Sequence, residues 1–362
     1  MGSTPARWLS GSASALRRAL ANPDLRRIEL AWAGSTSAEF VSVVAFGLFA
    51  YRAGGATAVG TVAVIQMAPA MIVSPFAGIL GDTFRRELVT IASDVVRAST
   101  MALAAVAAGF DGPLWTVYLL AATLTIAGQA YYPAQAGLVP LVARSADDVT
   151  AASATSNLIR NAAGLVGPAL TGFLLLVTGV TALFFVSAGL FAVAALGLVR
   201  LRRTDTVRSA PSRRGVLHDV GDGLRAASRD RGVALVLALF AAHGVGRGAV
   251  GVLLVVVPIE VLALGSSGVG FVNATIGLGG LLGAVATAGL VGRRTLAGPM
   301  AAGLAATGAA LVLAGAVPTA VLVFAGIAAV GVGFSVVSVV GSTILVRSTR
   351  DDVLARVIGL LG

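Results

Sequence analysis

The chain consists of long apolar segments separated by short polar breaks. In the first 199 residues the apolar segments cover residues 28–51, 57–80, 88–109, 114–142, 150–178 and 180–199. Because a helix needs about 20 apolar residues to cross the hydrocarbon core of a bilayer, each segment predicts one membrane-spanning helix. The segments are continuous and do not alternate with period two, so we expect helices and not the strands of a membrane barrel.

An arginine-rich segment separates these six spans from a second set. Residues 200–231 hold nine arginines among Ser, Asp and Gly, and apolar segments then follow at 232–264, 268–291, 297–314 and 317–346. An eleventh segment opens near Val357, so we expect the chain to end within the eleventh span. The predicted organisation is therefore a tail (1–27), a six-span half (28–199), a basic linker (200–231) and an incomplete second half of about four and a half spans (232–362).

Composition supports an integral membrane protein. Of the 362 residues, 57% are hydrophobic and only 12% are charged, with a mean hydropathy of +0.93. Soluble domains carry about 25% charged residues, and half of that cannot cover a surface in water. The absence of cysteine excludes disulfides and thiolate metal sites, and we expect neither a metal nor a cofactor.

The net charge of +10 comes from arginines that concentrate in alternate loops. Arginines in this pattern are typical determinants of membrane topology. They account for the basic charge without a nucleic-acid partner, so we expect no binding of nucleic acid. If the N-terminus lies inside, the inside loops hold nearly all the loop arginines, and the outside loops offer only Arg52. The positive-inside rule then predicts that the N-terminal tail and the linker are both cytoplasmic.

The two halves also resemble each other in sequence. Residues 137–152 align without gaps on residues 341–356 and share Asp-Asp-Val. Asp147 and Asp148 lead into the fifth span, so Asp351 and Asp352 should lead into the eleventh. Truncation of the chain, a fragment of a longer protein, and a shortened protein of doubtful transport competence all remain open explanations for its end.

A short charged stretch between the second and third spans carries a family resemblance. Residues 78–88 read GILGDTFRREL, and charge is costly inside a bilayer, so this stretch is expected to be a loop at a membrane face. It resembles the cytoplasmic signature of major facilitator superfamily (MFS) transporters. The matching positions are Gly78, Leu80, Asp82 and Arg86, and the departures are Thr83, Arg85 and Glu87. The alternative is an ordinary polar turn.

The resemblance implies an all-α membrane protein of two pseudo-symmetric six-span halves, acting as a monomer. The chain is most similar in character to drug and siderophore exporters of the actinobacterial type. Such a protein would bind a small-molecule substrate within the lipid bilayer, with protons as the coupling ion.

A second stretch, in the fifth span, resembles the signature of antiporters in the same superfamily. Residues 163–172 read AGLVGPALTG, with Gly164, Gly167, Pro168 and Gly172 as the positions of interest. Pro168 removes a backbone donor and bends the helix, while the glycines allow close approach of a neighbour. The resemblance implies export. Small-residue packing without a transport role is the alternative.

Few ionisable residues lie deep in the apolar segments, and each is costly there unless it is paired or faces water. They are Glu39, Asp94, Arg97, Arg160, His243 and Arg247. Asp94 and Arg97 share one helix face, so we expect an intrahelical pair, or a network with Asp82 that locks the inward gate, in preference to substrate contact. Arg160 is a gate or cavity residue, and His243 is either a proton site or a hydrogen-bonded histidine.

In this superfamily the first, fourth, seventh and tenth spans line the central cavity. That places Glu39 and Arg247 among the candidates for proton or substrate binding. The fourth span adds polar and aromatic candidates, which are Gln129, Tyr131, Tyr132 and Gln135. Two readings of Glu39 stay open at this point: a proton carrier near the bilayer midplane, or a fixed ion pair with Arg247.

These features favour a secondary transporter of the cytoplasmic membrane that exports a small amphipathic molecule by alternating access, in antiport with protons. A lysophospholipid or other metabolite transporter of the same fold is the alternative, as is a transport-incompetent sensor or fragment. An intramembrane enzyme would need clustered catalytic side chains, and the two histidines lie 25 residues apart. No phosphate-binding loop of the type GxxxxGK[ST] is present, so ATP has no predicted role.

Overall fold

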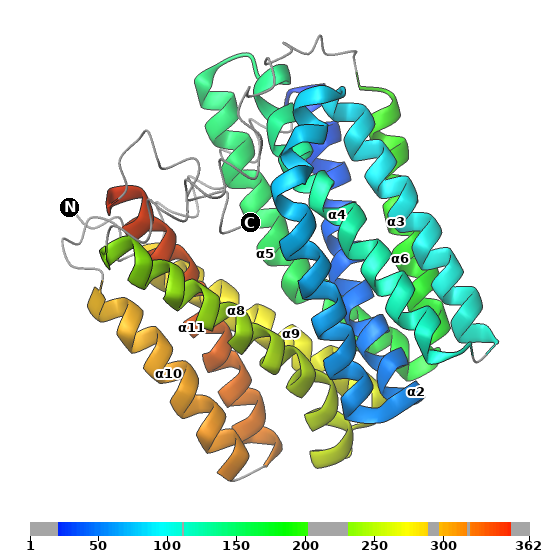
Figure 1. Ribbon diagram of the computed structural model, residues 1–362, viewed down its shortest axis with the longest axis vertical. Helices are drawn as coiled ribbons and strands as arrows, with labels where there is room; N and C mark the ends of the chain where they lie inside the picture. The colour runs from blue at the N-terminus through cyan, green and yellow to red at the C-terminus, as the bar shows by residue number, and fades with distance from the viewer. Residues whose placement is uncertain (1–20, 111, 202–230, 289–296, 317–318, 349–362) are drawn as a thin grey trace. The chain divides into compact units, whose positions relative to one another are not determined.

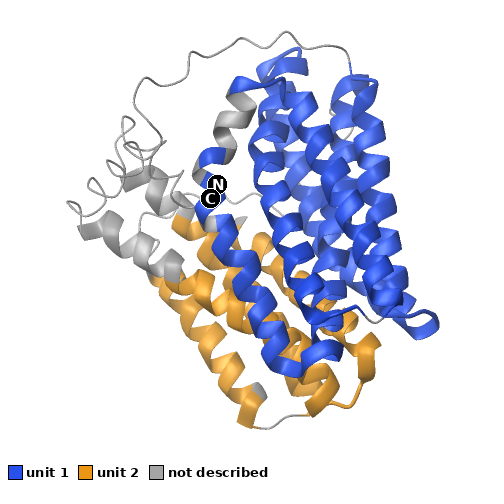
Figure 2. Ribbon diagram, turned by 45° about the vertical axis from the view of Figure 1, so that its right-hand side comes forward, with its two compact units in different colours: residues 1–211 blue, residues 212–362 orange. Residues whose placement is uncertain are grey.

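The computed structural model describes residues 21–110, 112–201, 231–288, 297–316 and 319–348, and all the regular elements in these ranges are helices (Figure 1). Within them, the side chains of residues 71, 75, 77–82, 231–241, 288, 297, 299, 314 and 342–348 are not described. Residues 1–20 of the predicted tail, nearly all of the linker, and the eleventh span lie outside the described residues. The end of the predicted tail is part of α2, which begins at Pro23. The chain divides into two compact units, residues 1–211 and 212–362 (Figure 2).

Unit 1 contains the helices that correspond to the six predicted spans. They are α2 (Pro23–Thr83), α3 (Arg86–Gly109), α4 (Leu114–Val142), α5 (Ala146–Val177) and α6 (Val180–Val199). The first two spans are both contained in α2, which is 61 residues long. At a rise of about 1.5 Å per residue its residues would span about 90 Å, roughly three times the hydrocarbon core of a bilayer, which leaves room for two spans.

Two glycines divide α2 into its two spans. Gly54 and Gly55 have non-helical backbone angles, and Gly55 has φ of 65°. An L-residue with a side chain is strained at such an angle, so glycine is the residue that fits this turn. We predicted a wider break, from Arg52 to Gly55, and the structure narrows it to these two residues.

Polar residues and glycine set the ends of α5 and α6. The Ser145 hydroxyl accepts a hydrogen bond from the Asp148 N–H at 3.2 Å and so caps the first turn of α5. Asp147 and Asp148 in that turn add favourable charge at the positive end of the helix dipole. Gly179 then separates α5 from α6.

The first span of α2 is the central element of unit 1. Helix α2 packs against α4, α5 and α6, while α3 packs against α4 and α6, and Figure 1 shows these helices running side by side. At one end of the unit the core contains Leu25, Ile28, Leu138 and Leu198, which come from α2, α4 and α6. The polar clusters described below lie further along the same faces of α2.

Unit 2 contains α8 (Arg231–Val256), a π-helical turn η1 (Val257–Val261), α9 (Gly265–Ala288), α10 (Ala297–Ala316) and α11 (Ala320–Ser348). These helices match the four predicted apolar segments, with α8 and η1 together covering the seventh. Gly265, with φ of 65°, turns the chain into α9. Helix α11 is the common neighbour of this unit, because it packs against α8, α9 and α10.

Glycine allows α9 and α11 to approach each other at the backbone. A Cβ atom on Gly279 would lie 2.0 Å from the Ala328 carbonyl oxygen, and one on Gly331 would lie 2.3 Å from the Ile276 oxygen. A Cβ on Gly283 would lie 2.8 Å from the Val332 oxygen. In a membrane, close contact of this kind is a main source of attraction between helices.

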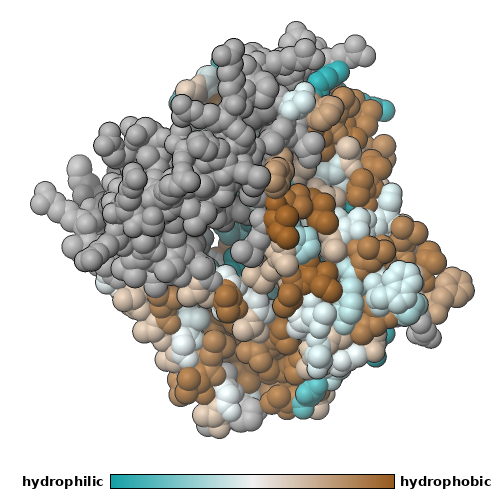
Figure 3. All heavy atoms as spheres, viewed as in Figure 1, coloured by the Kyte–Doolittle hydropathy of each residue, from teal (hydrophilic) through white to brown (hydrophobic). Residues whose placement is uncertain are grey.

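The outward faces of the helices are apolar. Phe173, Leu176, Val193 and Leu196 in unit 1 and Val312 in unit 2 are all more than half exposed, and apolar residues cover much of the described surface in Figure 3. Eight helical segments among the described residues are long and apolar enough to cross a membrane, and Met300–Leu313 is a shorter apolar helix. These faces suit contact with lipid tails.

Candidate functional site

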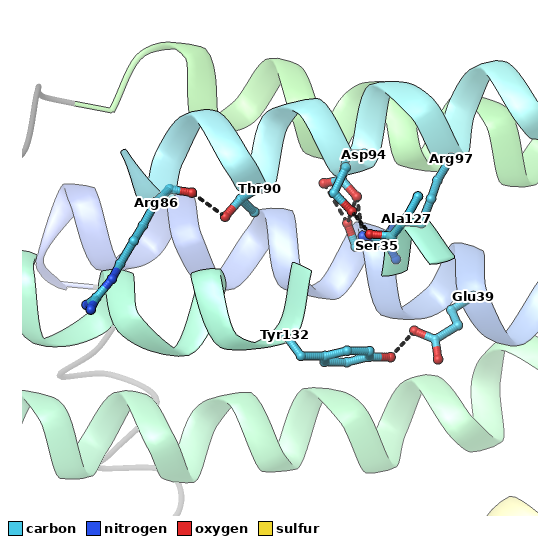
Figure 4. A network of polar contacts seen from close by, with 9 residues as sticks. Ser35, Glu39, Arg86, Thr90, Asp94, Arg97, Ala127 and Tyr132 are labelled. Atoms are coloured by element: carbon cyan, nitrogen blue, oxygen red, sulfur yellow. Dashed lines mark hydrogen bonds and ion pairs between the residues drawn. The ribbon is translucent and has the colours of Figure 1, made fainter. Parts of the chain in front are cut away.

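Three candidate residues from different helices meet in unit 1, at the middle of the first span. The Tyr132 hydroxyl on α4 donates a hydrogen bond to Glu39 Oε2 on α2 (Figure 4). Arg160 on α5 lies beside them, with its guanidinium carbon 5.4 Å from the centroid of the Tyr132 ring. The structure therefore brings together a carboxylate, a phenol and a guanidinium that are far apart in sequence.

This Glu39 cluster, defined as Glu39, Tyr132 and Arg160, is partly open. Glu39 and Tyr132 are half-buried and Arg160 is exposed. An exposed arginine within an apolar span is unfavourable against lipid tails, so this face suits water, substrate or protein. Arg160 also lies 5.9 Å from the Trp32 ring centroid. The cluster thus offers both signs of charge beside aromatic faces.

A second cluster, fully buried, lies between α3 and α2. Arg97 Nη2 pairs with Asp94 Oδ1 at 2.5 Å, and both side chains are almost completely buried. The Ser35 hydroxyl lies 2.8 Å from each Asp94 carboxylate oxygen. This Asp94 cluster, Asp94 with Arg97 and Ser35, contains the intrahelical pair predicted from sequence (Figure 4). Its role in an inward gate stays a prediction.

Aromatic rings hold Arg97 in place. Its guanidinium carbon lies 4.2 Å from the centroid of the Tyr131 ring and 4.5 Å from that of Phe191. A planar, weakly hydrated guanidinium is well suited to this position, because cation–π contact and the ion pair compensate for part of the lost water. Its Nε has no hydrogen-bond partner among the described residues. Tyr131, a candidate for the cavity wall, is therefore a buried partner of Arg97 in this structure.

Trp32 connects the two clusters. Its ring stacks on Tyr131 with centroids 6.0 Å apart and meets Tyr132 edge-on at 5.8 Å. Its indole N–H donates to the Ser156 carbonyl oxygen on α5 at 2.9 Å. Any displacement of α4 or α5 relative to α2 would therefore change the surroundings of this ring.

Sequence reasoning did not identify Trp32, Ser35 or Glu29. Trp32, Ser35 and Glu39 follow the spacing i, i+3, i+7, which places them on one face of a helix. Glu29 is buried at 1% exposure, although it was not counted among the intramembrane charges. The Ser156 hydroxyl on α5 lies 2.8 and 2.9 Å from its two carboxylate oxygens.

The predicted gate loop is mostly helical, which corrects our expectation. Helix α2 continues through Thr83 and α3 begins at Arg86, so only Phe84 and Arg85 separate them. Gly78, Leu80 and Asp82 are therefore in the last turns of α2, and their side chains lie outside the described part. The helix can continue through these charged residues because its last turns need only lie at the membrane face, outside the apolar core of the bilayer.

Of the four positions that match the gate signature, Arg86 is the one whose side chain the structure describes. It reaches from the start of α3 to the Gly137 carbonyl oxygen on α4, where Nη1 donates at 2.8 Å. A Cβ on Gly137 would lie only 2.5 Å from that nitrogen, so glycine makes room for the guanidinium. The contact ties α3 to α4 at one end of the unit.

The antiporter-like segment packs on the first span. A Cβ on Gly164 or on Gly167 would lie 3.2 Å from the Phe40 side chain, next to Glu39. Pro168 and Gly172 are buried in α5. The packing alternative thus has a direct structural basis, and the antiporter role of this segment stays a prediction.

The unit 2 candidates surround one aromatic ring. His243 on α8 meets Phe334 on α11 edge-on at 4.7 Å, and the Arg247 guanidinium carbon lies 5.9 Å from the same ring. His243 is buried, and none of the described residues gives its Nε2 a hydrogen-bond partner. Because Glu39 and Arg247 belong to different units, their predicted pairing stays a prediction.

Two glutamines complete the candidate set on α4. Gln129 is half-buried and Gln135 is buried, and the Gln135 amide nitrogen has no hydrogen-bond partner among the described residues. In the same part of the chain, no three His, Asp or Glu side chains are grouped as metal ligands would be.

Relatives with similar sequences are transporters by name. The chain is 28% identical over 193 residues to the multidrug efflux pump Tap of Mycobacterium tuberculosis, a match that covers 51% of this chain and 46% of the pump. It is 28% identical over 142 residues to the uncharacterized MFS-type transporter YfiS of Bacillus subtilis, covering 39% of this chain and 33% of that protein. The matches span less than half the length of these relatives.

Solved structures show the same fold at low identity. The nucleoside transporter NupG matches 94% of this chain and 86% of its own with a TM-score of 0.75 and 14% identity. A bacterial homologue of the iron transporter ferroportin, in an inward-facing state, matches 96% of this chain and 90% of its own with a TM-score of 0.67 and 16% identity. The family model described as Major Facilitator Superfamily matches residues 30–362. The chain is therefore a multi-pass membrane protein that belongs to the Major Facilitator Superfamily.

Proposed function

We propose that this protein is a secondary transporter of the cell membrane that exports a small amphipathic molecule by alternating access, in antiport with protons. The Glu39 cluster is the observation that carries the proposal. It places a carboxylate, a guanidinium and a phenol, from three different helices, beside the Trp32 ring at the middle of the first span. Charged groups beside aromatic faces suit a ligand with both polar and apolar parts.

The direction of transport rests on similarity. Tap is named a multidrug efflux pump, and the segment around Pro168 resembles an antiporter signature. The arginine distribution supports a cytoplasmic N-terminus and linker. The chain has no cysteine, so single cysteines introduced at Ser209 and Ser266 would test the orientation directly. An impermeant thiol reagent applied to intact cells should label the second position and leave the first unlabelled.

The substrate site can be tested by transport into proteoliposomes, with a panel of amphipathic cations, zwitterions and anions. We expect Glu39→Gln to weaken binding of cationic substrates by about tenfold, because a hydrogen bond to a charged group contributes about 1.5–3 kcal/mol. Arg160→Gln should weaken binding of anionic members instead. Opposite effects of the two variants would identify the charge of the accepted substrate.

Glu260→Gln is a matched control, since it makes the same chemical change in unit 2, on the exposed face of η1. This variant should transport as the unmodified protein does. If no member of the panel is transported by the unmodified protein, or if Glu39→Gln and Glu260→Gln behave alike, the Glu39 cluster is not a substrate site.

A further inference from the structure

The buried and half-buried carboxylates in the middle of unit 1 differ in the partners that compensate for their charge. Asp94 has Arg97 and Ser35, and Glu39 has the Tyr132 hydroxyl with Arg160 beside it. Among the described residues, Glu29 has one hydrogen-bond donor, the Ser156 hydroxyl, which lies within 2.9 Å of both oxygens. One hydroxyl has one hydrogen and can satisfy one oxygen at a time. Glu29 is therefore the carboxylate least able to carry a charge where it lies.

Charged groups on the elements around Glu29 have other partners or lie in water. On α2, Arg26 is exposed, and Arg27 bonds to Asp24 and to the Arg200 carbonyl oxygen. Arg160 lies against aromatic rings on α5, and Asp147 and Asp148 lie in the first turn of that helix. At α3, Arg97 pairs with Asp94, Arg85 pairs with Glu87, and Arg86 donates to the Gly137 carbonyl oxygen. Arg144, which follows α4, and Arg200, at the end of α6, are exposed. Among the described residues, no cation forms an ion pair with Glu29.

We propose that Glu29 is the proton-binding site of this protein and that its proton holds α2 against α5. A neutral carboxyl group fits the buried contact, because it can donate to the Ser156 hydroxyl oxygen while that hydroxyl donates elsewhere. Loss of the proton to water leaves an anion with one donor in a closed apolar contact, and the anion is stabilised only if the contact opens and is hydrated. Proton release thus favours separation of the two helices at this position.

The contact is placed to affect the substrate site. Ser156 supplies its hydroxyl to Glu29 and its carbonyl oxygen to the Trp32 indole, and it lies one helical turn before Arg160. A movement of α5 at Ser156 therefore shifts both Trp32 and Arg160. Proton binding is then the role of Glu29, and substrate binding is the role of Glu39. The role of Glu29 in coupling proton release to transport rests on the proposed function.

Infrared difference spectroscopy of the reconstituted full chain tests the protonation directly, without any substrate. A protonated carboxyl group has a C=O stretching band that an ionised group lacks. We expect such a band near neutral pH that disappears reversibly as the pH is raised. Glu29→Gln, an isostere of the neutral acid, should remove the band. Glu87→Gln should keep it, since the buried Glu87 is paired with Arg85.

The same variants separate coupling from transport. In proteoliposomes, an imposed pH gradient should accelerate transport by the unmodified protein, whereas rates of Glu29→Gln with and without the gradient should become equal. A band that persists in Glu29→Gln and vanishes in Glu39→Gln would overturn the assignment, whatever the transport assay shows. A chain that transports no panel member but shows the Glu29 band would contradict the proposed function and retain the proton site.

Discussion

The helices of unit 1 are joined by side chains, whereas the closest helix pair of unit 2 is joined by bare backbone. In unit 1, Ser35 bonds to Asp94, Trp32 to Ser156 and Arg86 to Gly137, each from one helix to another. In unit 2, Gly279, Gly283 and Gly331 allow α9 and α11 to touch along their main chains. The two units solve the same problem of helix association by different means.

The problem arises because lipid tails are as apolar as leucine. Burial of apolar surface therefore does little to draw membrane helices together, and attraction has to come from close packing or from polar contacts. Polar contacts also provide charge and protons for chemistry, while glycine contacts provide only shape. Among the described residues, the candidate chemistry is therefore concentrated in unit 1, with His243 and Arg247 as the exceptions in unit 2.

The largest expected effect is on the buried ion pair. Arg97→Leu leaves the buried Asp94 with Ser35 as its one hydrogen-bond donor among the described residues. The carboxyl group must then stay uncompensated or take up a proton, and loss of one partner of a buried pair costs about 3–5 kcal/mol. We expect unit 1 to lose most of its folded fraction, as measured by size-exclusion chromatography and thermal unfolding in detergent. The double variant with Asp94→Leu removes the unpaired carboxyl group and should recover much of the stability. A single variant as stable as the unmodified protein would show that polar contacts do not hold unit 1 together.

A smaller effect is expected at the glycine contact of unit 2. Gly279→Ala places a Cβ 2.0 Å from the Ala328 oxygen, so α9 and α11 must separate. Overpacking of this kind costs about 1–3 kcal/mol. The neighbouring Gly280→Ala is the matched control, because its Cβ would meet nothing within 4 Å. The control should be neutral or slightly stabilising, since alanine favours helix over glycine. Equal unfolding temperatures of the two variants would contradict backbone contact as the basis of unit 2.

The helices of both units could be predicted from sequence, because a run of about 20 apolar residues has few other stable states. The Asp94–Arg97 pair could be predicted too, since residues three apart on a helix are neighbours. The Glu39 cluster was predicted only as separate candidates. Tyr132 lies 93 residues after Glu39, and their contact depends on how α2 and α4 pack.

Glu29 shows why the remainder of the site could not be predicted. It follows Ile28, where we placed the start of the first span, and charges are ordinary at the end of a membrane helix. Helix α2 instead begins at Pro23, so Glu29 is inside the bundle and buried against α5. The predicted loop at residues 78–88 was misplaced in the same way, because α2 continues to Thr83, beyond the predicted end of the second span. A sequence pattern locates a helix end only within a turn or so, and that is enough to hide or expose a charge.

The smallest expected effect tests whether hydrogen bonds or charges distinguish the two units. The Ser187 hydroxyl on α6 donates to the Ala38 carbonyl oxygen on α2 at 2.9 Å, in full burial. The Ala38 oxygen also accepts a backbone hydrogen bond within α2, so Ser187→Ala leaves no buried polar atom without a hydrogen-bond partner. We expect the free energy of unfolding to fall by about 0.6 kcal/mol in denaturant titrations of detergent-solubilised protein, which is the usual value for a side-chain hydrogen bond in a membrane.

Asn273→Ala is the corresponding variant in unit 2, and it removes amide contacts to the Val269 and Leu254 oxygens. It should lower the free energy of unfolding by about as little, for the same reason. Similar small losses would leave buried charge as the property that sets unit 1 apart, whereas a loss at Ser187 near that of Arg97→Leu would show that neutral hydrogen bonds carry the difference.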